Sequence, residues 1–341
     1  MQLAHDVVLR RCPLPLLRHH DLPHPERGLA HGSLVRVRHG VYASTRMWDD
    51  LAPWDRYLCR VHAVALHHPD AVFCLESAAV LSGLPIFGDP VTVHVLVPRS
   101  GASRHVAGVR THRSAADRTI VEADGLLLTS PLDTAVDTAR HRHNAIGLAV
   151  ADAALRVNSA LRPDVLVAAN EARSSSRGRD IARWPLSHST PLAETALESI
   201  SRAVTGWLGF PPPELQVAFR AESGEEDRVD LLWRNPGSPL RQTGIAGEAD
   251  GQLKYDGRFG DPSSILRKQS RRDIRLREHV RSVTHWGWWE ATRFRPLRAI
   301  LVGAGLPVVA AENTPQLFSL KRALSAHVPP PPPPPPPREN T

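Results

Sequence analysis

Residues 32–43 read GSLVRVRHGVYA in one-letter code and carry the clearest local signal in the N-terminal part of the chain. Leu34–Val37 and Val41–Ala43 are rich in residues that favour β strands, and Gly40 lies between them. Glycine accepts the positive φ angle that a tight turn between antiparallel strands requires. The stretch therefore predicts a β hairpin.

Two segments before this hairpin are predicted to be short helices, one opening at Leu14–Leu17 and one at Pro25–Leu29. Helices followed by a hairpin make a winged helix-turn-helix, in which one helix enters the major groove of DNA and the hairpin contacts phosphate or the minor groove. We predict such a module for residues 1–46. The alternative is that a small helix-hairpin unit of this kind serves in dimerisation or docking.

Basic side chains of this module are candidates for DNA binding, because the duplex backbone is a polyanion. Arg27 would lie on the groove helix, and Arg36, Arg38 and His39 would lie on the wing. The chain has three lysines, and since Lys and Arg together number 42, it has 39 arginines. A GC-rich genome also produces this bias, so the abundance of arginine does not by itself indicate DNA binding.

Length, charge and cysteine content limit the classes of protein that fit. A length of 341 residues suggests two or three domains at roughly 150 residues each. The net charge of 42 minus 35, or +7, permits a polyanionic partner without showing one. The three cysteines form no C-x-x-C pair, which argues against a disulfide framework and a cysteine-based zinc site. We find no apolar run typical of a signal peptide or membrane span, so we expect a cytoplasmic protein with no membrane partner.

Residues 54–158 alternate between helical and strand patterns and predict a mixed α/β unit. Apolar residues at 91–97 recur with period two, as in a strand. Ser130-Pro131 is a typical helix start, because serine caps the first turn and proline suits the first helical position. Asp137 and Asp152 are interpreted as residues that cap or bridge helices rather than catalyse a reaction.

Three further segments complete the division of the chain. Small polar and basic residues around 174–179 predict a linker over residues 159–186. Residues 293–328 are predicted to form a C-terminal helical extension. Residues 329–337 are consecutive prolines, which favour extended polyproline II, so a disordered tail without assigned function is predicted for 329–341.

Five motifs follow one another in the first half of the chain. They are Gly32–Tyr42, Glu76–Pro85, Val93–Pro98, Thr129–Asp137 and Ala151–Arg156. In this order they resemble AbiEi-type antitoxins of type IV toxin-antitoxin systems, over residues 1 to about 158. The resemblance implies a sequence-specific DNA-binding autorepressor that opposes a nucleotidyltransferase toxin. DNA and a toxin of this type are therefore the expected partners, although many large actinobacterial relatives resemble standalone genes.

Acidic residues at regular spacing mark residues 191–290. Glu194 and Glu198 are four positions apart in a helix predicted from Pro191 to Trp207, so they would share one face. Three strand patterns follow this helix, at residues 215–219, 229–233 and 245–250.

These strands place three carboxylates where a metal ion could bind. Asp230 faces away from its apolar neighbours, and period two puts Glu248 and Asp250 on one face of the third strand. If Asp230 and Glu248 sit side by side, they offer the oxygen ligands that Mg²⁺ prefers. A metal there would activate water and stabilise charge on a phosphodiester. Asp230, Glu248 and Asp250 are thus predicted metal ligands, with Mg²⁺ as cofactor if the site is catalytic.

Within residues 187–292, a helix with glutamate precedes an aspartate on a second strand, a glutamate on a third, a basic helix and a last strand. This order resembles the PD-(D/E)XK nuclease superfamily, and most of all the branch similar to very-short-patch-repair endonucleases. The resemblance implies a restriction-endonuclease-like core of the order αβββαβ. It also implies a catalytic role for Glu198.

The chain departs from this superfamily at the lysine that should stand two residues after the glutamate, because that position is Asp250. Lys254 and Lys268 are the candidates for a displaced catalytic lysine, since an ammonium group can orient water or stabilise a transition state where guanidinium cannot. Arg271 and Arg272 belong to the basic helix and are predicted to contact DNA.

The predicted fold class is thus a multidomain α+β or α/β chain with a winged helix, a mixed α/β middle unit and a nuclease-like core. The first predicted function is a DNA-binding regulator or antitoxin-like protein. The alternative is a Mg²⁺-dependent DNA endonuclease of the very-short-patch-repair type. A third hypothesis is that the C-terminal domain has lost its chemistry and only binds a partner or structured nucleic acid.

Overall fold

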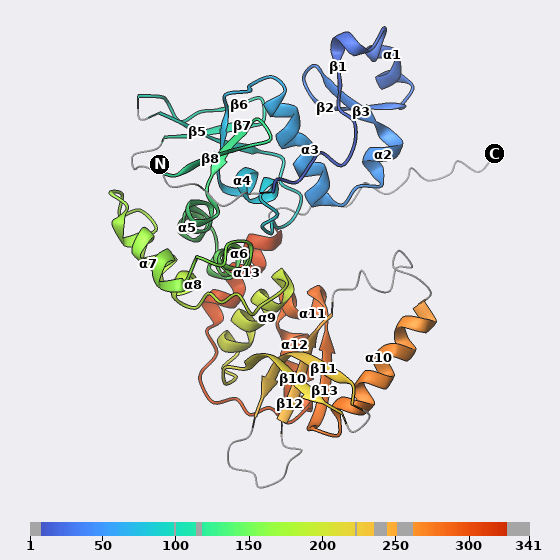
Figure 1. Ribbon diagram of the computed structural model, residues 1–341, viewed down its shortest axis with the longest axis vertical. Coiled ribbons are helices and arrows are strands. Elements are labelled where there is room, and N and C mark those ends of the chain that lie inside the picture. The colour runs from blue at the N-terminus through green and yellow to red at the C-terminus, as the bar shows by residue number, and fades with distance from the viewer. Residues whose placement is uncertain are drawn as a thin grey trace, which may run out of the picture.

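A computed structural model describes residues 8–98, 100–113, 118–221, 224–234, 244–250 and 262–325, with the backbone alone at 262–266 (Figure 1). The chain forms three sheets with helices packed between and around them. The mixed α/β class with several sheets is therefore confirmed. The predicted polyproline tail and Lys254 lie outside the described residues.

The N-terminal module contains the predicted hairpin. Its elements are β1 Leu17–Arg18, the 3-10 turn η1 His19–Asp21, α1 Pro25–Ala30, β2 Leu34–Arg38, β3 Val41–Ser44 and α2 Thr45–Asp49. Strands β2 and β3 are antiparallel and Gly40 has a φ of +72° at their turn, as predicted. Helix α1 is also found where it was expected.

The prediction of a helix that opens at Leu14–Leu17 is wrong. Leu17 instead belongs to β1, which pairs with β3 in a sheet of order β1-β3-β2. Pro13 and Pro15 explain the difference, because a residue that precedes proline is disfavoured in the helical region. The residues described before the hairpin thus contain one six-residue helix and one 3-10 turn, and the winged-helix assignment stays a prediction.

The middle unit is built on a six-stranded sheet of order β6-β7-β5-β4-β9-β8. Its strands are β4 Val72–Phe73, β5 Val93–Val97, β6 His105–Val106, β7 Val109–Arg113, β8 Ile120–Ala123 and β9 Leu126–Thr129. Its helices are α3 Pro53–Ala65, α4 Leu75–Leu81, α5 Pro131–His141 and α6 Asn144–Val157. The predicted start of α5 is confirmed, because the Ser130 side chain accepts a hydrogen bond from the Asp133 amide.

The segment 159–186 is not a linker. It contains α7 Pro163–Ala172 and most of α8 Arg179–Ser187. Leu166, Ala182 and Leu186 are fully buried in a hydrophobic core shared with α5 and α6. The polar run around 174–179 is only the connection between these helices. The prediction from local composition did not detect the apolar faces of α7 and α8, because these faces are buried by helices distant in sequence.

The C-terminal part has the element order that the sequence predicted. The elements are α9 Ala196–Trp207, β10 Glu214–Arg220, β11 Glu226–Trp233, β12 Gly244–Ala249, α10 Pro262–Leu276 and β13 Val280–Trp286. The sheet order is β10-β11-β12-β13, antiparallel except for the parallel pair of β12 and β13. The order αβββαβ is thus present, while its identification as an endonuclease fold stays a prediction.

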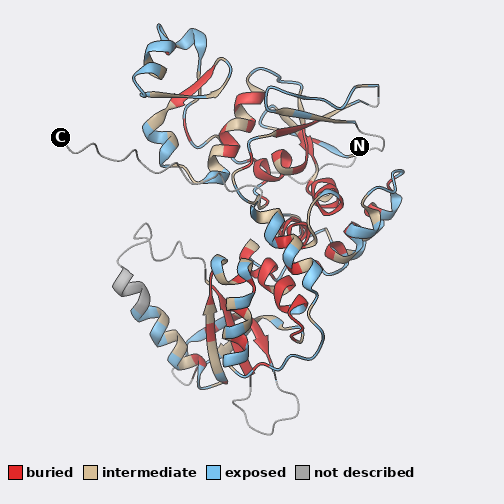
Figure 2. Cartoon of the chain, turned by 180° about the vertical axis from the view of Figure 1, so that it is seen from behind, coloured by how far each residue is buried: buried red, intermediate tan, exposed pale blue. Residues whose placement is uncertain are grey.

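The middle and C-terminal parts share one hydrophobic core. Ala145 and Leu148 of α6 are buried in the same cluster as Ile200 and Val204 of α9. Figure 2 shows the buried helical segments in red. The last helices, α11 Trp288–Arg293, α12 Arg295–Gly303 and α13 Thr314–Ser325, also contribute to it, and Leu317 of α13 is fully buried there. None of the described helices is long and apolar enough to cross a membrane.

The thiols of Cys12 and Cys59 are in contact, with 3.7 Å between the two sulfur atoms and a hydrogen bond that lowers the pKa of Cys12. Mild oxidation with diamide is therefore expected to join them in an intramolecular disulfide. Cys74, the third cysteine, lies outside this contacting pair and should remain a free thiol. Non-reducing peptide mass spectrometry checks this, with Cys59→Ser as the control that cannot form the bond. Disulfide-linked dimers of the wild-type chain would contradict the expectation.

Candidate functional site

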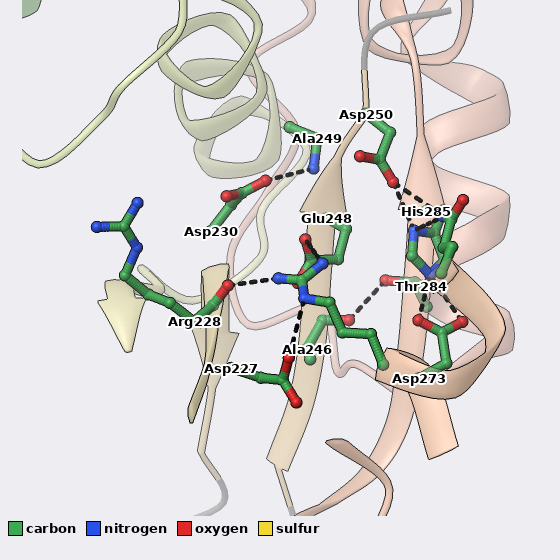
Figure 3. Close-up of polar contacts among 12 residues, drawn as sticks. Asp227, Arg228, Asp230, Ala246, Glu248, Ala249, Asp250, Asp273, Thr284 and His285 are labelled. Atoms are coloured by element: carbon green, nitrogen blue, oxygen red, sulfur yellow. Dashed lines mark hydrogen bonds and ion pairs between the residues drawn. The ribbon is translucent and has the colours of Figure 1, made fainter. Parts of the chain in front are cut away.

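Four acidic residues predicted as catalytic or metal-binding line one cavity of about 680 Å³, namely Glu198 of α9, Asp230 of β11, Glu248 of β12 and Asp250 just after β12, and Glu194 lines it as well. The register of the sheet explains this, since Leu231 pairs with Gly247 and the next position on each strand carries Asp230 and Glu248. The predicted side-by-side placement of these two carboxylates is thus supported (Figure 3).

Asp230 is held from both neighbouring strands. One carboxylate oxygen accepts a hydrogen bond from the Ala249 amide at 2.9 Å, and the other faces the Gln216 amide nitrogen at 3.4 Å. The same Gln216 nitrogen donates to Glu198 at 2.8 Å. Burial raises the pKa of Asp230, and the nearby charge of Asp250 adds to this effect. Sequence reasoning missed Gln216, because its role depends on its register opposite Asp230.

Glu198 has a structural role in addition to lining the cavity. Its amide donates to the Thr195 side chain, while its carboxylate accepts from the Glu194 amide at 2.9 Å, which together cap the start of α9. The helix therefore begins at Ala196, not at Pro191 as predicted, and Glu194 precedes it. Burial and the charge of Asp230 raise the pKa of Glu198.

Glu248 forms a two-pronged ion pair with Arg272 of α10. The two terminal guanidinium nitrogens donate to the two carboxylate oxygens at 2.9 and 3.0 Å. The Glu248 side chain is only 3% exposed. Burial, reinforced by Asp230, raises the pKa of Glu248 to about 7 although Arg272 opposes the shift. The predicted phosphate contact of Arg272 is not what the structure shows, because its guanidinium is directed at the sheet. Neighbouring Arg271 is exposed.

His285 of β13 lies between two carboxylates. Its Nδ1 is 2.7 Å from Asp250, and its Nε2 is 3.0 Å from Asp273 of α10. Gln269 donates a further hydrogen bond to Asp250 at 3.1 Å. Sequence reasoning missed His285 because no spacing among the 18 histidines singled it out. The parallel pairing of β12 with β13 places it beside Glu248.

Burial opposes protonation of His285, but the two carboxylates outweigh it and raise its pKa above 6.5. A histidine whose pKa is raised on folding stabilises the protein below its unfolded pKa, and this contribution is lost as pH rises through the folded value. We therefore expect His285→Gln to flatten the fall in unfolding free energy from about pH 6.5 upward. Urea titrations of both proteins between pH 5.5 and 9 test this. Parallel pH profiles would contradict it.

The described residues give no support to the predicted catalytic lysines or to a metal site. Lys268 of α10 is exposed, and Lys254 lies outside the described chain. Within the described ranges, no group of three or more His, Cys, Asp or Glu side chains is arranged to hold a metal ion. The assignments of catalytic lysine and Mg²⁺ ligands therefore stay predictions.

The cavity lies between two parts of the chain. Trp54 at the start of α3 and Pro85 and Ile86 after α4 line it from the middle unit. Trp288 lines it from the C-terminal part and packs edge-on against Phe87 of the middle unit. The carboxylates therefore face the middle unit.

The predicted DNA-binding residues of the N-terminal module differ in exposure. Arg27 on α1, Arg36 on β2 and His39 in the hairpin turn are exposed. Arg38 instead donates to the Ala107 carbonyl at 3.2 Å, which ties the hairpin to the turn between β6 and β7. The Arg38 guanidinium therefore makes a contact inside the protein.

Asp137 and Asp152 bridge structural elements, as interpreted from the sequence. Asp137 of α5 binds the Arg118 guanidinium through both oxygens, at 2.6 and 3.0 Å. Asp152 of α6 is fully buried and pairs with Arg202 of α9 at 3.0 Å. Neither residue lines the cavity that holds Asp230 and Glu248.

Comparison of the sequence with known proteins identifies related proteins. Residues 71–183 match the AbiEi antitoxin C-terminal domain, which spans the six-stranded sheet and extends into α8. The chain is also 36% identical over 204 residues to the uncharacterized proteins Rv2248 and MT2308 from two strains of Mycobacterium tuberculosis. The match covers 59% of this chain and 70% of each relative. No solved structure matches the chain significantly.

Proposed function

Because the chain belongs to one family with these mycobacterial proteins and carries an AbiEi antitoxin C-terminal domain, we propose that it is an antitoxin-like, DNA-binding regulator. The observation that carries the proposal is the antitoxin domain at residues 71–183. The N-terminal module supports it, since a short helix and a hairpin there expose Arg27, Arg36 and His39. In this proposal the module is a winged helix that contacts the phosphate backbone.

Binding to the protein's own promoter tests this function. A gel-shift titration should show a preference over random DNA of equal length, together with affinity that falls as salt rises, because bound cationic groups release counterions from DNA. Binding to the promoter no tighter than to random DNA would contradict the proposal that the protein is a regulator.

We further propose a nucleotidyltransferase toxin as the partner. The antitoxin domain supports this proposal, since antitoxins of this type act in toxin-antitoxin systems. Co-expression with a nucleotidyltransferase encoded beside this gene should relieve growth inhibition by that enzyme. Growth inhibition that persists at equal expression of both proteins would argue against this partner.

A second candidate function is a Mg²⁺-dependent DNA endonuclease. It is favoured by the convergence of Glu198, Asp230, Glu248 and Asp250 on one cavity. Carboxylate oxygens are suitable Mg²⁺ ligands, but Glu248 already uses both oxygens to bind Arg272. The residues as arranged therefore do not fit the ion. Plasmid cleavage in Mg²⁺ or Mn²⁺ that is abolished by Asp230→Ala would support the enzyme, and no cleavage of any DNA form would count against it.

A further inference from the structure

Asp230, Glu248 and Asp250 form the inner carboxylate cluster of the cavity. We infer that Arg272 supplies, from within the protein, the positive charge that this cluster would otherwise take from a divalent cation. The wild-type cluster would then bind no Mg²⁺ while the ion pair stands, and removal of the guanidinium would free the Glu248 carboxylate to reorient and bind a cation together with its neighbours. This inference does not rest on the proposed DNA-binding function.

The contacts of Arg272 show how firmly it is placed. Besides both oxygens of Glu248, its guanidinium donates to the Arg228 carbonyl and lies 3.7 Å from Asp227. Asp227 is itself held by Arg275 through two hydrogen bonds at 2.7 and 2.8 Å. A planar guanidinium matches a carboxylate with two parallel hydrogen bonds, so this pair is geometrically specific.

The other carboxylates also have partners from the protein. Asp230 accepts from the Ala249 amide, and Asp250 accepts from Gln269 and contacts His285. Magnesium needs six oxygen ligands near 2.1 Å in an octahedron. An ion bound to Glu248 would have to break the Arg272 fork and would then face a neighbouring positive charge. Cation binding and the ion pair should therefore exclude one another.

The charges around the cavity indicate what would follow if Arg272 were lost. Its lining residues include five carboxylates, namely Glu194, Glu198, Asp230, Glu248 and Asp250, and three arginines, namely Arg10, Arg228 and Arg272. Arg10 and Arg228 pair with Asp55 and Glu194. Arg272 is thus the lining arginine that neutralises the inner cluster. Without it, the buried Glu248 and its half-buried neighbours Asp230 and Asp250 would repel one another and favour a cation.

Thermal unfolding of the full-length protein with and without Mg²⁺ tests the inference. Arg272→Met keeps much of the length of the side chain but removes the charge, and Arg271→Met is the matched control on the exposed neighbouring position. In EDTA, Arg272→Met should melt at a lower temperature than the wild type. Millimolar Mg²⁺ should raise its melting temperature by about 5 °C, the size expected near a hundredfold excess over Kd. Wild type and Arg271→Met should not respond.

A second substitution identifies where the ion binds. Adding Glu248→Gln to Arg272→Met should abolish the response to Mg²⁺. If Arg272→Met does not fold, Arg272→Gln replaces it, because glutamine carries no charge but can still donate a hydrogen bond to Glu248, and Mg²⁺ should still stabilise that variant. Saturable Mg²⁺ binding by wild type in calorimetry would overturn the inference. So would the absence of any Mg²⁺ response in a folded Arg272 variant.

Discussion

Replacing Asp152 by alanine is expected to lower the free energy of unfolding by about 3–5 kcal/mol. Asp152 is fully buried and accepts hydrogen bonds from Arg202, the Ser199 hydroxyl and the Thr190 amide, the latter two at 2.7 Å. Alanine would leave the Arg202 guanidinium, which is only 17% exposed, without its carboxylate. Removing one partner of a buried pair costs more than the pair itself contributes, because the other charge stays desolvated.

Urea denaturation followed by circular dichroism measures this effect. Asp164→Ala is the matched control, because the pair between Asp164 and Arg162 is exposed and should contribute nothing measurable. Since Asp152 joins α6 of the antitoxin domain to α9, its loss should also weaken the coupling between the two parts. Equal unfolding midpoints for Asp152→Ala and Asp164→Ala would show that the buried bridge is unimportant.

Charge reversal of Arg27 and Arg36 to glutamate is expected to weaken promoter binding by about a hundredfold or more. Both side chains are exposed on the N-terminal module, where they would contact phosphate or base edges. Loss of two phosphate contacts should also reduce the dependence of log affinity on log salt by about two. Fluorescence anisotropy with labelled promoter DNA at several salt concentrations gives both quantities.

A double reversal elsewhere separates a specific contact from a change in total charge. Lys321 and Arg322 are exposed on α13, and their replacement by glutamate lowers the net charge by the same four units. This control should retain most of the affinity. Arg38→Ala should have a smaller effect than Arg36→Ala, because Arg38 donates to the Ala107 carbonyl. Equal losses in the two double variants would contradict a DNA-binding role for the module.

Several patterns confined to a few neighbouring residues were reliable. The hairpin around Gly40 follows from strand propensity and from the φ angle that only glycine adopts easily. The start of α5 follows from Ser130 and Pro131. The alternation in β11 and β12 placed Asp230 and Glu248 at the same cavity. In each case the determining forces act within a turn, a cap or a pair of strands.

Most errors arose where residues distant in sequence decide the outcome. The helix expected at Leu14–Leu17 is an exception, because the neighbouring Pro13 and Pro15 explain its absence. The prediction of a linker at α7 and α8 is wrong, because the stability of these helices comes from burial against α5 and α6 rather than from local propensity. Arg272 was assigned to DNA, since nothing in its neighbourhood along the chain shows that Glu248 lies within reach of its guanidinium. His285 was passed over for the same reason.

The amino-acid order alone was therefore sufficient for the hairpin around Gly40, the start of α5, the antitoxin-like character of residues 71–183 and the identity of the acidic residues. The tertiary structure decided which charges meet. It brought Arg272 from α10 onto Glu248 of β12, and it set His285 between Asp250 and Asp273. The physical reason is that an ion pair depends on distance and burial in three dimensions, and both are produced by packing that joins residues far apart in the chain.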